Sequence, residues 1–359
     1  MAVRLREVAA LAGVSPRSVS NVINGHRYIS PLMRAKVEAA IAELGYQPNL
    51  LARSLRSGRT GVVGLLVPEI GMPYFGELAH EVVEQARHLG LRVRIDETGG
   101  ERERELDLLD ELPRSGQVDG ILLSPCWLTC PELAAARVQQ PVVLLGERAL
   151  DAPVDHVGID NVGAARAVTQ HLLDGGRTRI AAVVEREHPR APTSQLRLEG
   201  YRSALAAAGL AADPELVAPM PVYPHRDDGA DAMGRLLDGP GRRPDAVFCF
   251  NDMVATGVLR ELRTCGLRVP DDVAVVGFDD VDECRFTAPS LSTVAPDKAA
   301  IARRALEALA ARVDGFDGPP QDIRVPYRLV IRDSSATPVS LTAESAPRVA
   351  GRAAPAARA

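Results

Sequence analysis

Residues 15–24 carry side chains whose types and spacing suit nucleic-acid recognition. A helical spacing of apolar positions predicts a short helix whose buried face is formed by Val19, Val22 and Ile23. The other face is polar and carries Arg17, Ser18, Asn21 and the nearby Ser20. Arginine can bond to guanine O6 and N7, asparagine can pair with adenine N6 and N7, and serine can bond to phosphates. The unbroken polar face therefore favours DNA binding over a plain helical hairpin, which would share only the amphipathic spacing.

Three short helices within residues 1–48 are expected to position this polar face. Serine followed by proline supplies an N-cap and a residue with no N–H to leave unpaired, and it precedes the second and third helices at Ser15-Pro16 and Ser30-Pro31. Glycine favours the backbone conformation that ends a helix, and it follows the three predicted helices at Gly13, Gly25 and Gly45. The arrangement predicts an all-α helix-turn-helix domain whose second helix reads DNA.

The overall net charge of −5 hides an uneven distribution of charge. Residues 1–60 contain nine Arg or Lys and three Glu, a net charge of +6, so the remaining 299 residues carry −11. Such asymmetry predicts a basic module that meets a polyanion and an acidic body that does not.

From Thr60 the sequence alternates between short apolar runs and amphipathic segments. Residues 62–67, 120–123 and 142–145 are apolar runs, as expected for parallel strands that helices cover on both faces. About 275 residues exceed one ordinary doubly wound domain, so we expect two lobes with a ligand between the carboxyl ends of their strands. Residues 336–359 lack periodicity and are expected to form a flexible tail.

Several other classes of protein are disfavoured. No apolar run reaches the roughly 18 residues that span a bilayer, and charges replace the apolar stretch of a signal peptide, so we expect a cytoplasmic protein without a membrane partner. Five scattered cysteines and seven histidines show no metal-ligand spacing, so neither a metal nor a cofactor is expected. Dinucleotide, P-loop and nucleophile-elbow motifs are absent, and only two lysines occur, so we do not expect an enzyme.

The segment Leu5-Arg-Glu-Val-Ala-Ala-Leu-Ala-Gly-Val-Ser-Pro-Arg-Ser-Val-Ser-Asn-Val-Ile-Asn-Gly25 resembles the N-terminus of the LacI/GalR family of transcription regulators. Other family signatures follow in family order at residues 39–49, 52–55, 60–68 and 275–280, and the resemblance covers residues 3–335. It implies a helix-turn-helix headgroup over residues 1–48, a hinge helix or linker over 49–59, and a two-lobed α/β effector-binding and dimerisation domain over 60–335. That last domain resembles periplasmic binding proteins.

The resemblance also assigns roles in DNA binding. It places Pro16, Arg17 and Asn21 at base-reading positions, and Asn21 departs from the arginine of most members, so the operator sequence is expected to differ. It makes Leu55 a wedge between central base steps in the minor groove, a role that a plain basic linker would not require. The full set of expected DNA contacts is Leu5, Ser15, Pro16, Arg17, Ser18, Ser20, Asn21, Asn24, Tyr28, Asn49, Ala52, Arg53, Leu55 and Arg56.

Effector contacts are expected where strands of the body end. By resemblance, Tyr74 and Phe75 cover the apolar face of a sugar, although Phe75 could equally be a core residue. Arg197 matches a family arginine that bonds to ligand hydroxyls or a carboxylate, whereas a lone helix arginine is usually solvated. The less specific candidates are Ser124, Glu147, Asp160 with Asn161, and Tyr223, with a hinge or capping role as the alternative for Asp160-Asn161.

Two Asn-Asp or Asp-Asp pairs follow later apolar runs. The family pattern favours Asn251 and Asp279 as effector contacts, while Asp252 and Asp280 have capping of the following helices as their alternative role. The charged run over residues 101–105 is expected to be a solvated helix face with local ion pairs.

Together these features predict a homodimeric transcription regulator that binds a pseudo-palindromic operator, because one headgroup reads only a half-site. The main interpretation is a repressor of carbohydrate-utilisation genes controlled by a sugar-like effector. Two alternatives remain: a corepressor-driven regulator that senses a purine or phosphorylated metabolite, and a sugar-binding protein without a regulatory role.

Overall fold

The computed structural model describes residues 3–23, 28–46, 59–135, 138–146, 154–185, 192–221, 224–239 and 243–336. The chain divides into two compact units, residues 1–158 with 297–325 and residues 159–296 with 326–359. Within the first unit we call residues 3–46 the headgroup and the other described residues the first lobe. The described residues of the second unit form the second lobe. The predicted hinge segment, apart from Arg59, and the tail after Ala336 lie outside the described residues.

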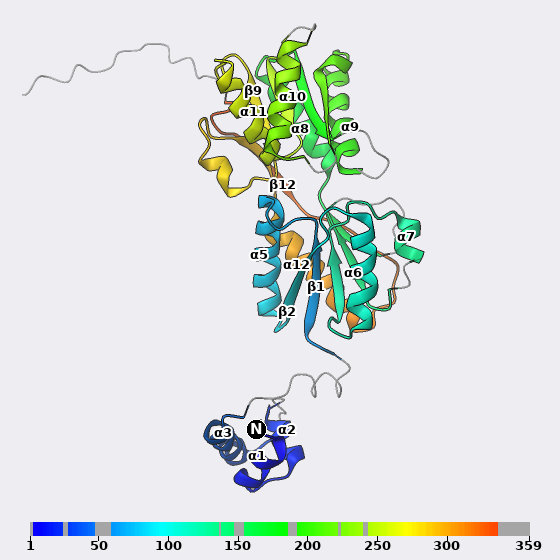
Figure 1. Cartoon of the computed structure of the whole chain (residues 1–359), viewed down its shortest axis with the longest axis vertical. Coiled ribbons are helices and arrows are strands. Elements are labelled where there is room, and N and C mark those ends of the chain that lie inside the picture. The colour runs from blue at the N-terminus through cyan, green and yellow to red at the C-terminus, as the bar shows by residue number, and fades with distance from the viewer. Residues whose placement is uncertain are drawn as a thin grey trace, which may run out of the picture. The chain divides into compact units, whose positions relative to one another are not determined.

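The headgroup consists of three helices, α1 (Leu5–Ala12), α2 (Pro16–Ile23) and α3 (Pro31–Leu44) (Figure 1). Ser15 and Ser30 cap the second and third helices, because their hydroxyls accept the N–H groups of Ser18 at 3.1 Å and Met33 at 3.3 Å. Gly13 and Gly45 end α1 and α3 with φ values of 66° and 59°, a left-handed conformation that glycine adopts without steric cost. The limits of α1 and α3 and the start of α2 confirm the sequence prediction, while Gly25, the predicted end of the second helix, lies outside the described residues.

A small apolar core joins the three headgroup helices. Val8, Val19 and Val37 are fully buried, one from each helix, and Tyr46 packs with them. The apolar stripe of α2 faces this core, so its polar face is turned away from it.

The first lobe contains a parallel sheet in the order β11-β5-β4-β3-β1-β2. Its strands are β1 (Val62–Val67), β2 (Arg92–Glu97), β3 (Gly120–Leu123), β4 (Val142–Leu145), β5 (Asp155–Gly158) and β11 (Asp322–Arg324). Its helices are α5 (Pro73–His88), α6 (Arg102–Arg114), α7 (Cys130–Ala135) and α12 (Lys298–Val313). Leu108, Leu109 and Leu112 of α6 pack on one face of the sheet, and α12, which contacts α5, packs on the other.

The second lobe has a sheet in the order β12-β10-β9-β8-β6-β7, parallel except for β12. Its strands are β6 (Ile180–Glu185), β7 (Val217–Met220), β8 (Ala246–Cys249), β9 (Ala274–Phe278), β10 (Ser292–Pro296) and β12 (Tyr327–Val330). Its helices are α8 (Asn161–Asp174), α9 (Pro192–Ala207), α10 (Arg226–Asp238) and α11 (Asp252–Thr264), with short 3₁₀ turns η1 (Pro214–Leu216) and η2 (Asp282–Arg285). Helix α8 packs with α9, and α10 with α11, around the sheet (Figure 1).

The chain passes between the lobes after Gly158, after Pro296 and after Val325. Helix α12 and strand β11 therefore belong to the first lobe, although they follow β6 to β10 of the second lobe in the sequence, and β12 then belongs to the second lobe again. The pattern of apolar runs does not predict that the chain passes back to the first lobe. Strand β10 contains the polar residues Ser292 and Thr293, and β11 begins and ends with charged residues, Asp322 and Arg324.

Two properties of the described residues bear on function. No helix among them is both long and apolar enough to cross a membrane. Nor do three or more of their His, Cys, Asp and Glu side chains come together in a group that could hold a metal ion.

Candidate DNA-reading and effector-contact residues

The polar face of α2 presents Arg17 and Asn21. Arg17 is exposed and Asn21 is half-buried. Within the described part of the chain, neither side chain takes part in a hydrogen bond or an ion pair. Both can therefore bond to an external partner without first breaking an internal contact, as base reading requires.

The serines of the same region contribute to the start of the helix. The Ser15 hydroxyl accepts the Ser18 N–H, and the two hydroxyl oxygens lie 2.9 Å apart. Pro16, beside them, is exposed and Ser20 is half-buried. Ser15 and Ser18 thus stabilise the first turn of α2. A hydrogen bond to a phosphate would use the donor or acceptor positions of their hydroxyls that these contacts leave unoccupied.

Leu5 and Tyr28 differ sharply in exposure. Leu5 is half-buried and packs against the headgroup core, so part of its side chain is not accessible to DNA. Tyr28 is 99% exposed, which leaves its ring and hydroxyl open to a partner. The other residues predicted to contact DNA lie outside the described residues: Asn24, Asn49, Ala52, Arg53, Leu55 and Arg56. So do two predicted effector contacts, Glu147 and Tyr223.

In the first lobe, Tyr74 and Phe75 occupy the first turn of α5. Their rings meet edge to face, with centroids 5.2 Å apart and planes at 72°. Both are half-buried, so neither is a fully buried core residue. Lys298 lies with its Nζ 5.9 Å from the Tyr74 ring centroid and pairs with Glu77 at 2.8 Å. The aromatic pair follows the carboxyl end of β1, where α/β sheets bind ligands.

Ser124 directly follows β3, and a buried carboxylate orders the loop after it. Ser124 is buried, and its N–H donates to the Leu66 carbonyl at 2.9 Å. Glu105 of α6 is 0% exposed and accepts the N–H groups of the next loop residues, Cys126 at 2.7 Å, Trp127 at 3.3 Å and Leu128 at 3.1 Å. Burial raises the pKa of Glu105 to about 7, although these N–H donors favour its charged form.

The prediction of a solvated charged face over residues 101–105 is therefore wrong for Glu105. The reason is its position on α6, because Glu105 shares the sheet-facing side of the helix with Leu108, Leu109 and Leu112. Arg102 does form ion pairs, with Glu132 of α7 and with Glu103 at 3.5 Å.

In the second lobe, Arg197 of α9 is buried rather than solvated. Its Nε donates to Asn161 Oδ1 at 2.8 Å, and its Nη1 donates to the Phe250 carbonyl. The guanidinium carbon lies 3.4 Å from the centroid of the Phe278 ring. These contacts orient the guanidinium at the carboxyl ends of β8 and β9, because Phe250 follows β8 and Phe278 ends β9.

Asn251 and Asp160 each cap a helix. Asn251 Oδ1 accepts the Val254 N–H at 2.7 Å and begins α11, while Asp160 Oδ1 accepts the Gly163 N–H at 2.9 Å and begins α8. For Asp252 and Asp280 the sequence offers capping as the alternative role. Asp252 instead points to the sheet, and Asp280 pairs with Arg332 at 2.6 Å. The capping alternative is thus wrong for both. Asn251, the residue before Asp252, is the N-cap of α11, and Val281, the residue after Asp280, is the N-cap of η2.

The turn that follows β9 has an unusual backbone. Asp279 and Asp280 have φ values of 116° and 47°, and no other non-glycine residue in the described ranges has positive φ. Each such residue costs about 1 to 3 kcal/mol unless its surroundings stabilise it. Asp279 is only 9% exposed. Strained backbone of this kind gathers at ligand sites, and Asp279 is a predicted effector contact.

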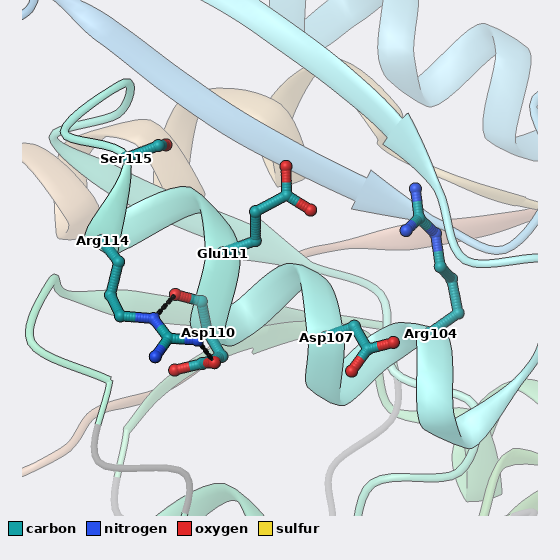
Figure 2. Close-up of a pocket in the computed structure, with 6 residues that line it drawn as sticks. All are labelled: Arg104, Asp107, Asp110, Glu111, Arg114 and Ser115. Carbon is teal, nitrogen blue, oxygen red and sulfur yellow. Dashed lines mark hydrogen bonds and ion pairs between the residues drawn. The ribbon is translucent and has the colours of Figure 1, made fainter.

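Two surface hollows lie apart from these residues. Figure 2 shows a charged one on α6, lined by Arg104, Asp107, Asp110, Glu111, Arg114 and Ser115, in which Arg114 pairs with Asp110. A more apolar one lies between α9 and strands β6 and β7, where the Ser194 hydroxyl donates to Glu185 at 2.8 Å. None of the predicted effector contacts lines either hollow. A ligand site needs convergent polar groups in a concave apolar setting, and one solvated helix does not provide this, so we place no effector site in the charged hollow.

Sequence reasoning missed two residues that build these sites. Phe278 orients Arg197 together with Asn161, a residue that the sequence did single out, and Glu105 orders the loop after Ser124. Their signal was weak, because each acts through a residue distant in the sequence.

A helix-turn-helix headgroup joined to two α/β lobes defines a DNA-binding regulator with a ligand-binding body, and comparison with known proteins agrees. Residues 4–49 match the model of bacterial regulatory proteins of the lacI family, and residues 169–335 match a periplasmic binding protein-like domain. The ribose operon repressor of Escherichia coli (strain K12) is 36% identical over 314 residues, which cover 86% of this chain and 92% of that protein.

Two solved structures extend the comparison. A complex of the transcriptional regulator CelR with cellobiose is 34% identical and covers 92% of this chain and 99% of that chain, with a TM-score of 0.67. The lac repressor dimer bound to operator and the anti-inducer ONPF is 25% identical and covers 93% of this chain and 99% of that chain, with a TM-score of 0.81. The chain belongs to the LacI family of bacterial regulatory proteins.

Proposed function

We propose that this chain is a repressor of carbohydrate-utilisation genes whose operator affinity is controlled by a sugar-like effector. The observation that carries the DNA-binding half is the exposed face of α2, where Arg17 and Asn21 have no internal partners among the described residues. Relatives that include a ribose operon repressor and a cellobiose-bound regulator support a carbohydrate effector. Because its proposed target is operator DNA, we propose that the protein acts in the cytoplasm. We also propose that it is a binding protein rather than an enzyme.

The working unit is a homodimer on a pseudo-palindromic operator. One headgroup reads one half-site, and a two-fold symmetric dimer matches two of them. The lac repressor structure supports this, since that protein binds operator as a dimer. Residues 49–59 are proposed to fold on the operator, where Leu55 would wedge between base steps.

The effector acts by changing the populations of the operator-competent and operator-incompetent states of the dimer. It binds the residues at the strand ends of the lobes, Tyr74, Phe75, Ser124, Glu147, Asp160, Arg197, Tyr223, Asn251 and Asp279. Its effect on operator affinity equals the difference between its affinities for the operator-competent and operator-incompetent states.

A thermal-shift screen of monosaccharides, disaccharides, sugar phosphates and nucleobases tests the effector half, followed by operator binding with and without each compound that binds. We expect a sugar to raise the melting temperature and to weaken operator binding. A nucleobase or sugar phosphate that strengthens operator binding would instead establish corepression. If no compound changes stability or operator affinity, the effector half is wrong.

Deletion of residues 1–58 tests whether operator binding depends on the headgroup and sugar binding on the rest of the chain. The truncated chain should lose operator binding and keep the thermal shift with the sugar. Retention of operator binding would contradict the assignment of DNA recognition to the headgroup.

A further inference from the structure

Three consecutive backbone N–H groups in the turn after β9 each have an acceptor. The Asp279 N–H donates to the Val294 carbonyl at 2.8 Å, an ordinary contact with the next strand. The Asp280 N–H donates to the Thr293 hydroxyl at 3.3 Å, and the Val281 N–H donates to Asp252 Oδ2 at 3.1 Å. Two of the three acceptors are therefore side chains.

These two side chains also bond to each other. The Thr293 hydroxyl donates to Asp252 Oδ1 at 2.6 Å, so it accepts from the turn and donates to the carboxylate. Asp252 is 1% exposed and Thr293 is 0% exposed. The chain of bonds joins the start of α11 and strand β10 to residues 280–281.

The surroundings of Asp252 are shaped to admit its carboxylate. A Cβ on Gly277 would lie only 2.1 Å from Asp252 Oδ1, so glycine at this position lets the carboxylate approach strand β9. Burial raises the pKa of Asp252, and the hydrogen bonds from Thr293, Cys284 and Val281 oppose that rise. An apolar side chain would fill this space without the cost of desolvating a carboxylate. We attribute the presence of a buried carboxylate at this position to its two hydrogen bonds, from the Val281 N–H and from the Thr293 hydroxyl.

The outer side of the turn is also held. Asp280 Oδ1 accepts from Arg332 Nη2 at 2.6 Å, and Arg328 lies 3.8 Å from Oδ2. Arg332 also donates to the Leu291 carbonyl at 2.8 Å, which ties it to the segment before β10. Asp280 is thus bound through both its backbone and its side chain.

We infer that Asp252 and Thr293 are positioning residues that act through the turn of residues 279–281 to set the orientation of Asp279 toward the effector. They bind the backbone on the carboxyl side of Asp279 and stabilise two left-handed residues that would otherwise relax. The inference rests on the proposed function, because it takes Asp279 as an effector contact. It adds that effector affinity depends on two buried residues that do not touch the effector.

Thr293→Val in the full-length dimer tests this inference, because valine keeps the shape of threonine and removes its hydroxyl. Thr293→Ser restores the hydroxyl and serves as the rescue variant. Thr169→Val is the matched control, because Thr169 is also 0% exposed in the second lobe and its hydroxyl donates within α8, to the Ala165 carbonyl at 2.9 Å. Arg332→Gln removes the ion pair with Asp280 and thereby loosens the turn through a different contact. It replaces Thr293→Val in the test if that variant does not fold.

Two readouts are measured on each variant. The first is amide hydrogen exchange of the peptide that contains residues 279–281, which needs no ligand. The second is the dissociation constant for D-ribose and for cellobiose by calorimetry, alongside operator affinity without sugar. We expect Thr293→Val to speed exchange in this peptide and to weaken binding of whichever sugar the wild-type chain binds by at least tenfold. Thr293→Ser and Thr169→Val should stay within about threefold of wild type, and operator affinity without sugar should not change in any of them.

Unchanged exchange in Thr293→Val and Arg332→Gln would overturn the inference, whichever ligand is used. Faster exchange with unchanged sugar affinity would overturn it too, because the turn would then not set the orientation of Asp279. If the wild-type chain binds neither sugar, the carbohydrate choice in the proposed function fails separately, and the exchange measurement still decides whether the Thr293 hydroxyl, which bonds to Asp252, holds the turn.

Discussion

Arg312 of α12 forms a two-bond ion pair with Asp155 of β5, with Nε 2.8 Å from Oδ2 and Nη2 2.7 Å from Oδ1. Asp155 is 3% exposed, and Arg312 also donates to the carbonyls of Gly318 at 2.6 Å and Pro319 at 2.9 Å. The pair thus joins the returning segment of the chain to the sheet of the first lobe, across 157 positions in the sequence.

Arg312→Met should lower the free energy of unfolding by about 3 to 5 kcal/mol, because it leaves a buried carboxylate without its partner. Arg304→Met on the same helix is the control, since its pair with Glu307 at 3.0 Å is half-exposed and should contribute less than about 1 kcal/mol. Urea unfolding of both variants at pH 7 makes the comparison. Similar losses in the two would show that burial of the Arg312 pair does not matter.

Glu105→Gln should change how stability depends on pH. Burial holds the pKa of Glu105 at about 7 in the folded chain, above its ordinary value of 4.5, so the folded state keeps a proton that the unfolded chain has released. The contribution of Glu105 is therefore full below pH 4.5 and is lost as pH rises through about 7. Between pH 5 and 8 the wild-type chain should lose roughly 2 to 3 kcal/mol relative to Glu105→Gln.

Glu103→Gln is the control for this effect, because Glu103 is exposed on the same helix. The measurement is urea unfolding at several pH values. A stability difference between Glu105→Gln and wild type that is the same at pH 5 and pH 8 would contradict the raised pKa.

Arg17→Ala should relax sequence preference at one position in each half-site. Loss of a two-bond contact with a guanine costs about 1 to 3 kcal/mol of discrimination. Arg17→Lys keeps the charge but not the paired donors, so it should lose preference while retaining more of the non-specific affinity. Selection of binding sites from a random library reads out both variants, and an unchanged preference would remove Arg17 from base reading.

Arg197→Lys should weaken binding of the sugar found in the screen by at least tenfold. An ammonium group cannot donate to Asn161, donate to the Phe250 carbonyl and stack on Phe278 as the planar guanidinium does. Arg202→Lys, on an exposed position of the same helix, should leave that affinity unchanged. Calorimetry distinguishes the two, and equal affinities in both variants would argue that Arg197 is structural only.

Operator binding should weaken steeply with salt. The +6 charge of residues 1–60 neutralises phosphates and releases their counterions, whereas the acidic remainder of the chain adds repulsion. A regulator with six or more phosphate contacts loses on the order of 1000-fold in affinity between 50 and 200 mM salt. Fluorescence anisotropy with a labelled operator measures the slope, and a nearly flat dependence would contradict the electrostatic role of the headgroup.

The headgroup could be predicted closely from the sequence, because its signals are local. The serine caps, the glycine stops and the apolar stripe of α2 each depend on residues within four positions of one another. The polar face of α2 follows from the same spacing, so Arg17 and Asn21 could be chosen without a tertiary structure. The apolar runs likewise identified the parallel strands β1, β3 and β4, since burial on both faces leaves a local signature.

Only the tertiary structure decided which charged residues are buried and what they bind. Glu105 and Glu103 lie in one charged run, yet Glu105 orders a loop that begins 21 positions later and Glu103 is solvated. Asn251 and Asp252 are neighbours, yet the first caps α11 and the second reaches a turn near residue 281. Local spacing tells which side of a helix a residue occupies, but its partners depend on how distant strands and helices are brought together, and that is a property of the folded chain.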